Sequence, residues 1–226
     1  MRARQREERR QRLVHAARKL LAESGAEGFS MATLAKQAGL SLATPYNLFG
    51  SKAAILHAVF AAEVEGLHRS VGKVDARDPA RIAFRVAARI AEVFSRKPDF
   101  YRGLSHSLSM LGSDEFQRLV VPLSDTMLTP MVRALADAGI LRAAIPADVL
   151  DVQIAYAAGS VFLHWVVLHW SEQRLAAELS VSFGLTLLGA LDEPPRPAFA
   201  AALDAMTAEL VALRASDPDA TVQVPR

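Results

Sequence analysis

The segment LATPYNLFGSK, which runs from Leu42 to Lys52, concentrates groups that donate and accept hydrogen bonds. It carries the hydroxyl of Thr44, the phenol of Tyr46, the amide of Asn47 and the ammonium group of Lys52. Such groups suit phosphate oxygens and the edges of nucleic-acid bases. The chemistry that they indicate is recognition of a nucleic acid, and the alternative is a half-buried Tyr46 ring packed on a neighbouring helix.

Pro45 lies in the middle of this segment and decides which side chains face outward. A proline inside a helix removes a hydrogen bond and collides with the carbonyl four residues earlier. A helix here must therefore be short, with Pro45 near its first turn. The pattern places Pro45 on an inward-facing apolar row with Leu34, Leu40 and Leu48. Thr44, Tyr46 and Asn47 are then predicted to face outward.

Three short helices are predicted to position these side chains. The first begins near Arg12 with apolar residues at three- and four-residue steps, the second is MATLAKQA, and the third begins at Leu42. The expected caps at helix starts are Ser30, Ser41 and, for a fourth helix, Ser51. The glycines expected to end helices are Gly25, Gly39 and Gly50. Two short helices joined by a tight turn at residues 39–41 predict a helix-turn-helix.

The run GFSMATLAKQAGLSLATPYNLFGSKAAIL resembles the DNA-binding domain of tetracycline-repressor-type (TetR family) transcriptional regulators. The resemblance covers roughly residues 10–60. It includes the Ala-x-x-x-Gly turn, the Thr-x-Tyr-x-x-Phe segment and the Ser-Lys that opens the next helix. Pro45 departs from the family, many of whose members carry an aliphatic residue there.

The resemblance implies a homodimer with two such DNA-binding domains, here called heads. Each head places its third helix in the major groove of double-stranded DNA. It implies that Thr44 and Tyr46 contact the DNA and that Lys52 binds a phosphate from the start of the fourth helix. Ser41 is a further candidate, and the outward placement of Asn47 adds it to the set. Lysine is disfavoured by the dipole at a helix N-terminus, so a phosphate opposite Lys52 would explain its presence there.

Charge is unevenly spread along the 226 residues, whose net charge is +2. Residues 1–69 hold eleven Lys and Arg against six Asp and Glu, or 11 − 6 = +5, and the remainder hold fifteen against eighteen, or 15 − 18 = −3. A basic head suggests a polyanionic partner, and a merely solvated tail is the alternative. The basic arm at residues 1–12 is expected to be disordered without DNA and to follow phosphates or enter the minor groove.

Composition favours an all-α protein, with hydrophobic residues at 51% and few β-branched runs. There is no cysteine, which excludes disulfides, thiolate metal sites and cysteine nucleophiles. The sequence contains no phosphate-binding loop, no nucleophile elbow and no metal-ligand spacing, so it indicates neither an enzyme nor a cofactor. His164 and His169 are five residues apart and fall on different helix faces, so no metal site is expected. The apolar run at residues 154–170 is interpreted as a helix buried between other helices rather than a membrane span, and the expected location is the cytoplasm.

Residues 51–216 are predicted to form a helical ligand-binding and dimerisation domain after a DNA-binding domain at residues 1–50, with a disordered tail at 217–226. Helix breaks are expected near Pro79, Pro98, Gly112, Gly139, Pro146 and Pro195. The dimer contact is placed on two helices at about 148–172 and 175–191, the second with Gly184, Thr186 and Gly189 for close approach. Ordinary core helices are the alternative.

Candidates for the ligand pocket combine apolar bulk with a polar or polarisable group. They are His106, Met110, Met127, Met131, Tyr156, Phe162 and Trp165. Four arginines recur every four residues: Arg77, Arg81, Arg85 and Arg89. One interpretation is a solvated helix face whose charges are balanced by nearby acidic residues. The other is that one of these arginines binds an anionic ligand.

The function expected is a ligand-responsive transcriptional repressor, released from a palindromic operator by a small, largely apolar effector. An architectural helical dimer that binds DNA without sequence preference is the competing hypothesis, and footprinting separates the two.

Overall fold

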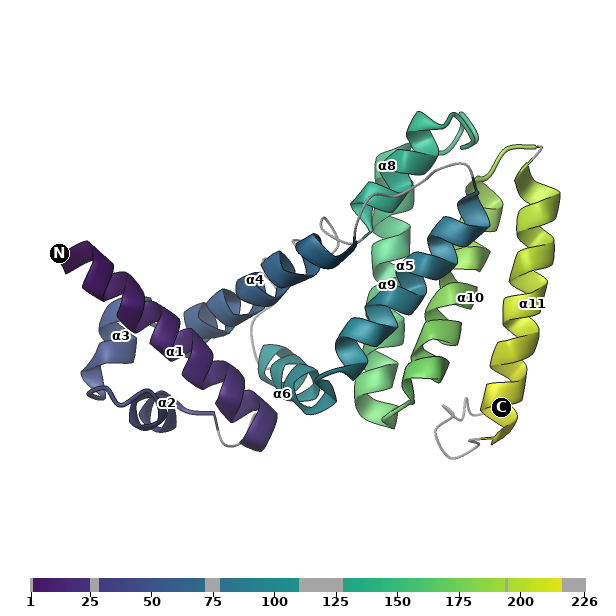
Figure 1. Cartoon of the computed structure of the whole chain (residues 1–226). Helices are drawn as coiled ribbons and strands as arrows, with labels where there is room; N and C mark the ends of the chain where they lie inside the picture. Colours follow the sequence, from purple (N-terminus) through teal and green to yellow (C-terminus); the bar gives the residue numbers. More distant parts are fainter. Residues whose placement is uncertain (1, 25–28, 72–77, 110–127, 194, 217–226) are drawn as a thin grey trace. The chain divides into compact units, whose positions relative to one another are not determined.

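The computed structural model describes all residues except 1, 25–28, 72–77, 110–127, 194 and 217–226, and it is built from α-helices (Figure 1). The helices are α1 (Arg2–Ser24), α2 (Met31–Gln37), α3 (Ala43–Phe49), α4 (Lys52–Val71), α5 (Pro79–Ser95), α6 (Pro98–Ser109), α8 (Thr129–Asp137), α9 (Ala147–Leu168), α10 (Glu172–Ala190) and α11 (Pro195–Ser216). In these described ranges the only extended pairing is a single bridge between Leu141 and Leu191. The predicted all-α class is confirmed. The tail at 217–226 and the break near Gly112 lie outside the described residues.

The chain divides into two compact units. Unit 1 holds α1, α2, α3, most of α4, and α6, whereas unit 2 holds α5, α8, α9, α10 and α11. This division differs from the boundary expected at residue 50. The reason is that Ile55, Leu56 and Val59 of α4 are fully buried, so the start of α4 belongs to the apolar core of unit 1.

Unit 1 is organised around α1, which contacts α2, α3 and α6. Its buried face repeats at three- and four-residue steps, as an amphipathic helix requires. The residues of α1 on that face are Leu13, Ala16, Ala17, Leu20 and Leu21. In α6, Phe100 and Tyr101 are buried and their rings meet edge to face at 5.1 Å between centroids. A third helix partner for α1 was not anticipated, because α6 lies far along the sequence.

Helix boundaries in unit 1 follow the predicted caps with one exception. Ser30 accepts from Thr33 N, and Thr33 Oγ1 accepts in return from Ser30 N, which forms a capping box at the start of α2. Gly39 and Gly50 have φ of +63° and +81° and follow α2 and α3, as predicted. Ser51 Oγ accepts from Ala54 N at the start of α4. Ser41 is the exception, because α3 begins one residue later than expected, at Ala43, and its N-cap position is Leu42 without a side-chain hydrogen bond.

Residues 2–12 of the basic arm are helical, so the expectation of a disordered arm was wrong. Helix α1 begins at Arg2, ten residues before the predicted start. Arginine and glutamate favour helices, and the ion pair of Arg4 with Glu8 at 3.1 Å has the i, i+4 spacing that supports one. The apolar pattern used to place the start cannot detect such a polar helical extension.

Unit 2 is built around α10, which packs on α5, α9 and α11 (Figure 1). Helix α5 begins after Asp78, whose carboxylate accepts from Arg81 N, and it buries one continuous stripe. The stripe consists of Ile82, Ala83, Val86, Ala87, Ile90, Ala91 and Phe94. The predicted breaks at Pro79, Pro98, Gly139, Pro146 and Pro195 are confirmed as helix starts or ends.

An ion pair between the exposed Arg214 and the buried Glu178 joins α11 to α10. Arg214 donates two hydrogen bonds to the Glu178 carboxylate, at 3.0 and 2.7 Å, and these bonds raise the pKa of Arg214. Glu178 also pairs with Arg174, whose guanidinium carbon lies 4.8 Å from the Trp170 ring centroid. Removing one partner of such a buried set costs more than the pair itself contributes, because it leaves a charge unpaired.

Gly184 has a role different from the one that the sequence indicated. It is buried on α10, and a Cβ built on it would lie 2.4 Å from Leu203 Cδ1 of α11. The close approach that this glycine permits is therefore within the chain, between α10 and α11. Gly189 is exposed, with nothing within 4 Å of a built Cβ, and so keeps the predicted dimer role open.

We expect Gly184→Val to lower the free energy of unfolding by about 1–3 kcal/mol, because the side chain overfills the α10–α11 contact. Leu203→Ala alone should cost about 2–5 kcal/mol through the cavity it leaves. Urea unfolding of the double variant should show a loss smaller than the sum, since the shortened Leu203 relieves the clash. Strictly additive losses would mean that the two residues do not share this contact.

Candidate nucleic-acid interface

Helix α3 divides its side chains between the core and solvent in the predicted way. Pro45 is buried as the third residue of the helix, where no intrahelical donor is lost. Tyr46 is 51% exposed and Asn47 is also exposed, while Thr44 is half-buried. Tyr46 therefore faces outward, as predicted, while about half of its surface stays covered by the rest of the domain.

Ser41 and Thr44 are linked at the start of α3. Their hydroxyl oxygens are 2.9 Å apart, and Thr44 N donates to the Ser41 carbonyl at 2.9 Å. Ser41 therefore orients the Thr44 hydroxyl instead of capping a backbone N–H. Each hydroxyl keeps further hydrogen-bonding capacity, so the pair can still meet a phosphate or a base edge.

Lys52 is the first residue of α4 and is partly exposed. Its Nζ lies 5.1 Å from the centroid of the buried Phe29 ring, within the range of a cation–π contact. This contact positions the ammonium group, and it gives Lys52 a structural role that the sequence did not indicate. The predicted phosphate contact of Lys52 stays a prediction.

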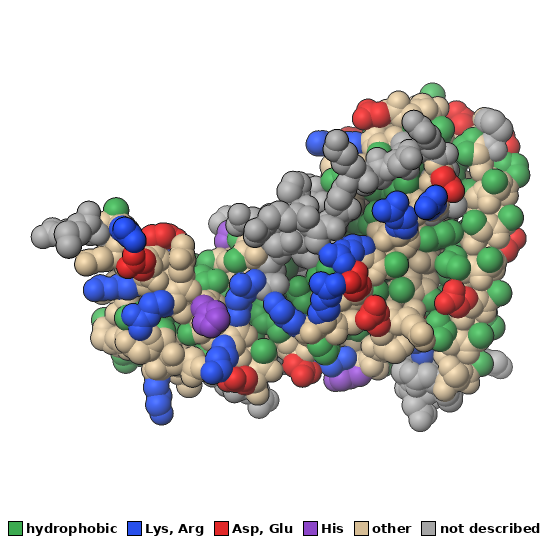
Figure 2. All heavy atoms as spheres, in the orientation of Figure 1, with side chains coloured by type: hydrophobic (Ala, Val, Ile, Leu, Met, Phe, Trp, Pro, Cys, Tyr) green, Lys and Arg blue, Asp and Glu red, His purple; other side chains and the backbone are tan. Residues whose placement is uncertain are grey.

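Charged side chains on the surface are partly compensated by neighbours of opposite sign. Figure 2 shows Lys and Arg side chains on the face drawn, several with Asp or Glu beside them. In α1, Arg4 pairs with Glu8, and Lys19 with Glu23 at 3.7 Å. On the face drawn, basic and acidic side chains are thus interspersed.

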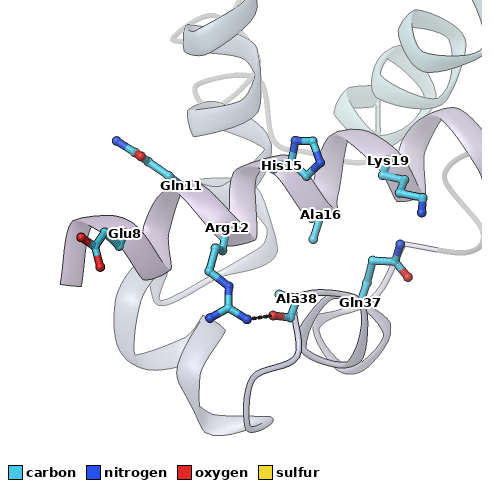
Figure 3. A pocket seen from close by; sticks show the side chains of 8 residues that line it. All are labelled: Glu8, Gln11, Arg12, His15, Ala16, Lys19, Gln37 and Ala38. Carbon is cyan, nitrogen blue, oxygen red and sulfur yellow. Dashed lines mark hydrogen bonds between the residues drawn. The ribbon is translucent and has the colours of Figure 1, made fainter. Parts of the chain in front are cut away.

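Two arginines of α1 are directed at the helix-turn-helix itself. Arg12 Nη2 donates to the Ala38 carbonyl at 2.7 Å, where α2 ends (Figure 3). Arg10 Nη1 donates to the Leu48 carbonyl at 2.7 Å, in the last turn of α3. The sequence placed both arginines in a basic arm that either contacts DNA or is a merely solvated tail. A local pattern does not reveal partners 26 and 38 residues away.

A groove of about 660 Å³ lies beside Arg12, between α1 and the end of α2 (Figure 3). Its lining residues are Glu8, Gln11, Arg12, His15, Ala16, Lys19, Gln37 and Ala38. In Figure 3, Lys19 and Gln37 extend toward each other across it. Mixed charges and an open shape make it part of the polar surface of the head.

The helix-turn-helix region of the chain is similar to a known protein family. Residues 13–59 match the family model described as bacterial regulatory proteins, tetR family. Residues 13–59 therefore form a TetR-type DNA-binding domain. The matched segment spans the buried face of α1, the helix-turn-helix and the start of α4. A TetR family member is a DNA-binding transcriptional regulator and not an enzyme. No curated protein sequence matches the chain.

Solved structures agree on the fold. A TetR family transcriptional repressor, FadR of Thermus thermophilus, in complex with lauroyl-CoA, is 22% identical with a TM-score of 0.66, covering 81% of this chain and 96% of its own. A TetR family regulator of Streptomyces coelicolor is 19% identical with a TM-score of 0.61, covering 94% of this chain and 91% of its own. SmeT, the repressor of the Stenotrophomonas maltophilia multidrug efflux pump SmeDEF, is 18% identical with a TM-score of 0.58, covering 82% of this chain and 92% of its own.

The residues predicted to line a ligand pocket are not brought together in one described unit. His106 lies in α6 of unit 1, whereas Met131 lies in α8 and Tyr156, Phe162 and Trp165 lie in α9 of unit 2. Met110 and Met127 lie outside the described residues. Met131 and Trp165 are buried and Tyr156 is 69% exposed.

An aromatic cluster in unit 2 contains one residue that sequence reasoning missed. The Phe94 ring of α5 lies 4.8 Å from Phe162 and 6.0 Å from Trp165, between centroids. Phe94 ends the buried stripe of α5, so periodicity marks it as core but not as a partner of α9.

The arginine series on α5 is partly explained by ion pairs. Glu92 accepts hydrogen bonds from both Arg89 and Arg96. The bond from Arg89 has the largest effect on the pKa of Glu92, and together with the charges of both arginines and the bond from Arg96 it lowers that pKa against the opposing effect of desolvation. Arg81 and Arg85 are exposed, and Arg77 lies outside the described residues. No group of three or more possible metal-ligating His, Asp or Glu side chains occurs in the described part of the chain.

Proposed function

We propose that this TetR family regulator represses transcription in the cytoplasm as a homodimer, and that a small, largely apolar effector releases it from a palindromic operator. The main support for DNA binding is the outward polar face of α3, where Tyr46 and Asn47 are exposed and Pro45 is buried. A short helix that follows a tight turn and presents phenol and amide groups is suited to the major groove.

The dimer part of the proposal rests on α9. This helix is apolar, but within one chain only Leu150, Ile154 and Trp165 of it are buried, so the cover expected from other helices is incomplete in a single copy. Its exposed apolar side chains follow three-, four- and seven-residue steps along one face, and they are Val149, Val152, Tyr156, Leu163 and Val167. We call these five residues the α9 face. By length and composition α9 could also cross a membrane, but core helices of soluble proteins pass the same test.

A second copy of the chain is the occupant that we propose for the α9 face. An isologous two-fold contact pairs the face with itself and removes its apolar side chains from water. Leu185 of α10 is 63% exposed and Gly189 falls one turn further along the same side. Two helices from each protomer would then form the contact, at the positions predicted from the sequence.

The effector part of the proposal rests on unit 2. Aromatic rings of Phe94, Phe162 and Trp165 meet there, and such clusters favour apolar ligands over charged ones. The similar FadR of Thermus thermophilus holds lauroyl-CoA, which carries a long apolar chain. Effector binding would favour a head spacing that no longer fits successive turns of the operator.

We expect Tyr46→Ala to weaken binding to a duplex selected by the wild-type protein by about 1.5–3 kcal/mol per head, the value of a charge-assisted hydrogen bond. Its effect on the free energy of unfolding should stay within about 0.5 kcal/mol, because the side chain is half exposed. Fluorescence anisotropy measures the first quantity and urea unfolding the second.

Tyr46→Phe is the matched control, since it keeps the ring and removes only the hydroxyl. It should lose most of the same affinity if the phenol contacts DNA. Unchanged affinity in both variants would contradict the proposed interface at α3.

A further inference from the structure

Helix α3 has little of its own to fix its orientation. It has seven residues, and Pro45 is its only fully buried one. An isolated helix of this length is not stable in water, so contacts from elsewhere must hold it. The orientation of α3 in turn decides where Tyr46 and Asn47 point.

Arg10 of α1 provides such a contact at the C-terminal end of α3. Its Nη1 donates to the Leu48 carbonyl at 2.7 Å, and its guanidinium carbon lies 4.2 Å from the Phe49 ring centroid. The Leu48 carbonyl is in the last turn, where no N–H of α3 can reach it. A cation is also favoured there by the helix dipole. Arg10 thus satisfies an open carbonyl and stacks on an adjacent ring with one planar group.

Arg12 makes a parallel contact at the end of α2. Its Nη2 donates to the Ala38 carbonyl at 2.7 Å and would lie 3.4 Å from a Cβ built on Gly39 (Figure 3). Since Arg10 and Arg12 lie two residues apart on α1, one rigid helix holds the ends of both helices of the helix-turn-helix.

We propose that Arg10 is a positioning residue for operator recognition, which sets the angle of α3 and so the sequence discrimination of the head, and is not a phosphate contact. This inference rests on the proposed DNA interface. The two roles differ in their dependence on salt and on sequence. Loss of a phosphate contact weakens binding to every duplex and reduces the salt slope by about 0.9 per contact. Loss of a positioning residue weakens binding to the preferred duplex and leaves the slope unchanged.

The test uses the full-length protein and two duplexes: one enriched from a random library by the wild type, and a scrambled version of it. We expect Arg10→Met to raise Kd for the enriched duplex about tenfold or more, the scale of one charge-assisted hydrogen bond. Kd for the scrambled duplex and the slope of log Kd against log salt should stay close to wild type. Arg9→Met is the matched control, because it removes the same charge from the neighbouring exposed position and should not reduce discrimination.

Two further variants keep the test valid if Arg10→Met destabilises the head. Arg10→Lys keeps the charge but lacks the planar fork, so it should restore little discrimination. Phe49→Leu removes the ring beneath the guanidinium without changing any charge, and it should lose discrimination in the same direction. The double variant Arg10→Met/Phe49→Leu should lose less discrimination than the sum of the losses of the two single variants, because both substitutions act on one contact.

Equal weakening on both duplexes, with a reduced salt slope and full rescue by lysine, would overturn the inference and make Arg10 a phosphate contact. Wild-type discrimination in every Arg10 and Phe49 variant would overturn it as well, while leaving the DNA interface intact. Failure of the wild type itself to enrich any duplex would be a failure of the proposed function, and is thereby distinguished from both.

Discussion

Aspartate at both Tyr156 and Val167 is expected to convert the protein from dimer to monomer. These side chains are 69% and 70% exposed on the α9 face. A two-fold contact brings the face against its own copy, so the substitutions place four carboxylates in one apolar interface. Burying charge without partners costs several kcal/mol per group, which exceeds what a contact of ordinary size can absorb.

When the dimer is converted to a monomer, the affinity for the operator should fall by about 10²–10⁴-fold. A dimer binds its second half-site at the high effective concentration set by the first, and a monomer loses this gain without losing any contact to DNA. Light scattering after size-exclusion chromatography reports the oligomeric state, and anisotropy reports the affinity.

Val211→Asp is the control for the α9 face. Val211 is a 61% exposed apolar residue of α11, outside the proposed contact, and a charge there should leave both oligomeric state and affinity unchanged. A Tyr156→Asp/Val167→Asp protein that remains a dimer would place the contact elsewhere on the chain.

Pro45→Asp should unfold the head, whereas Pro45→Leu should be tolerated. An acidic residue in the first turn gains about 0.3–1 kcal/mol from the helix dipole. Pro45 is buried in the core of unit 1, however, and an unpaired carboxylate there costs about 3–5 kcal/mol, so burial decides the sign. Leucine keeps the position apolar and its N–H needs no intrahelical partner. Limited proteolysis of the head and operator binding would both report the difference, and equal tolerance of the two variants would contradict the inward placement of Pro45.

Features of the head that depend on a few neighbouring residues were predictable from the sequence. The Ser30 and Ser51 caps, the left-handed Gly39 and Gly50, and the burial of Pro45 each follow from local backbone chemistry. The family resemblance drew on the same segment, which is why it reached the helix-turn-helix and no further.

Features that depend on partners distant in sequence were not predictable. The contacts of Arg10 with Leu48, of Lys52 with Phe29 and of Gly184 with Leu203 join residues that only the folded chain brings together. The polar start of α1 was missed because no apolar residue marks it. The candidate pocket was drawn from residue type alone, which identifies core side chains without indicating which of them share a cavity.

The central claim is that this protein is a two-headed dimer that reads a palindromic operator. Hydroxyl-radical footprinting of the protein on its enriched duplex tests this claim most directly. The account predicts protection limited to two inverted half-sites, with major grooves about 34–36 Å apart or a multiple of that distance. Uniform protection along the duplex, without boundaries or symmetry, would contradict it and favour binding without sequence preference.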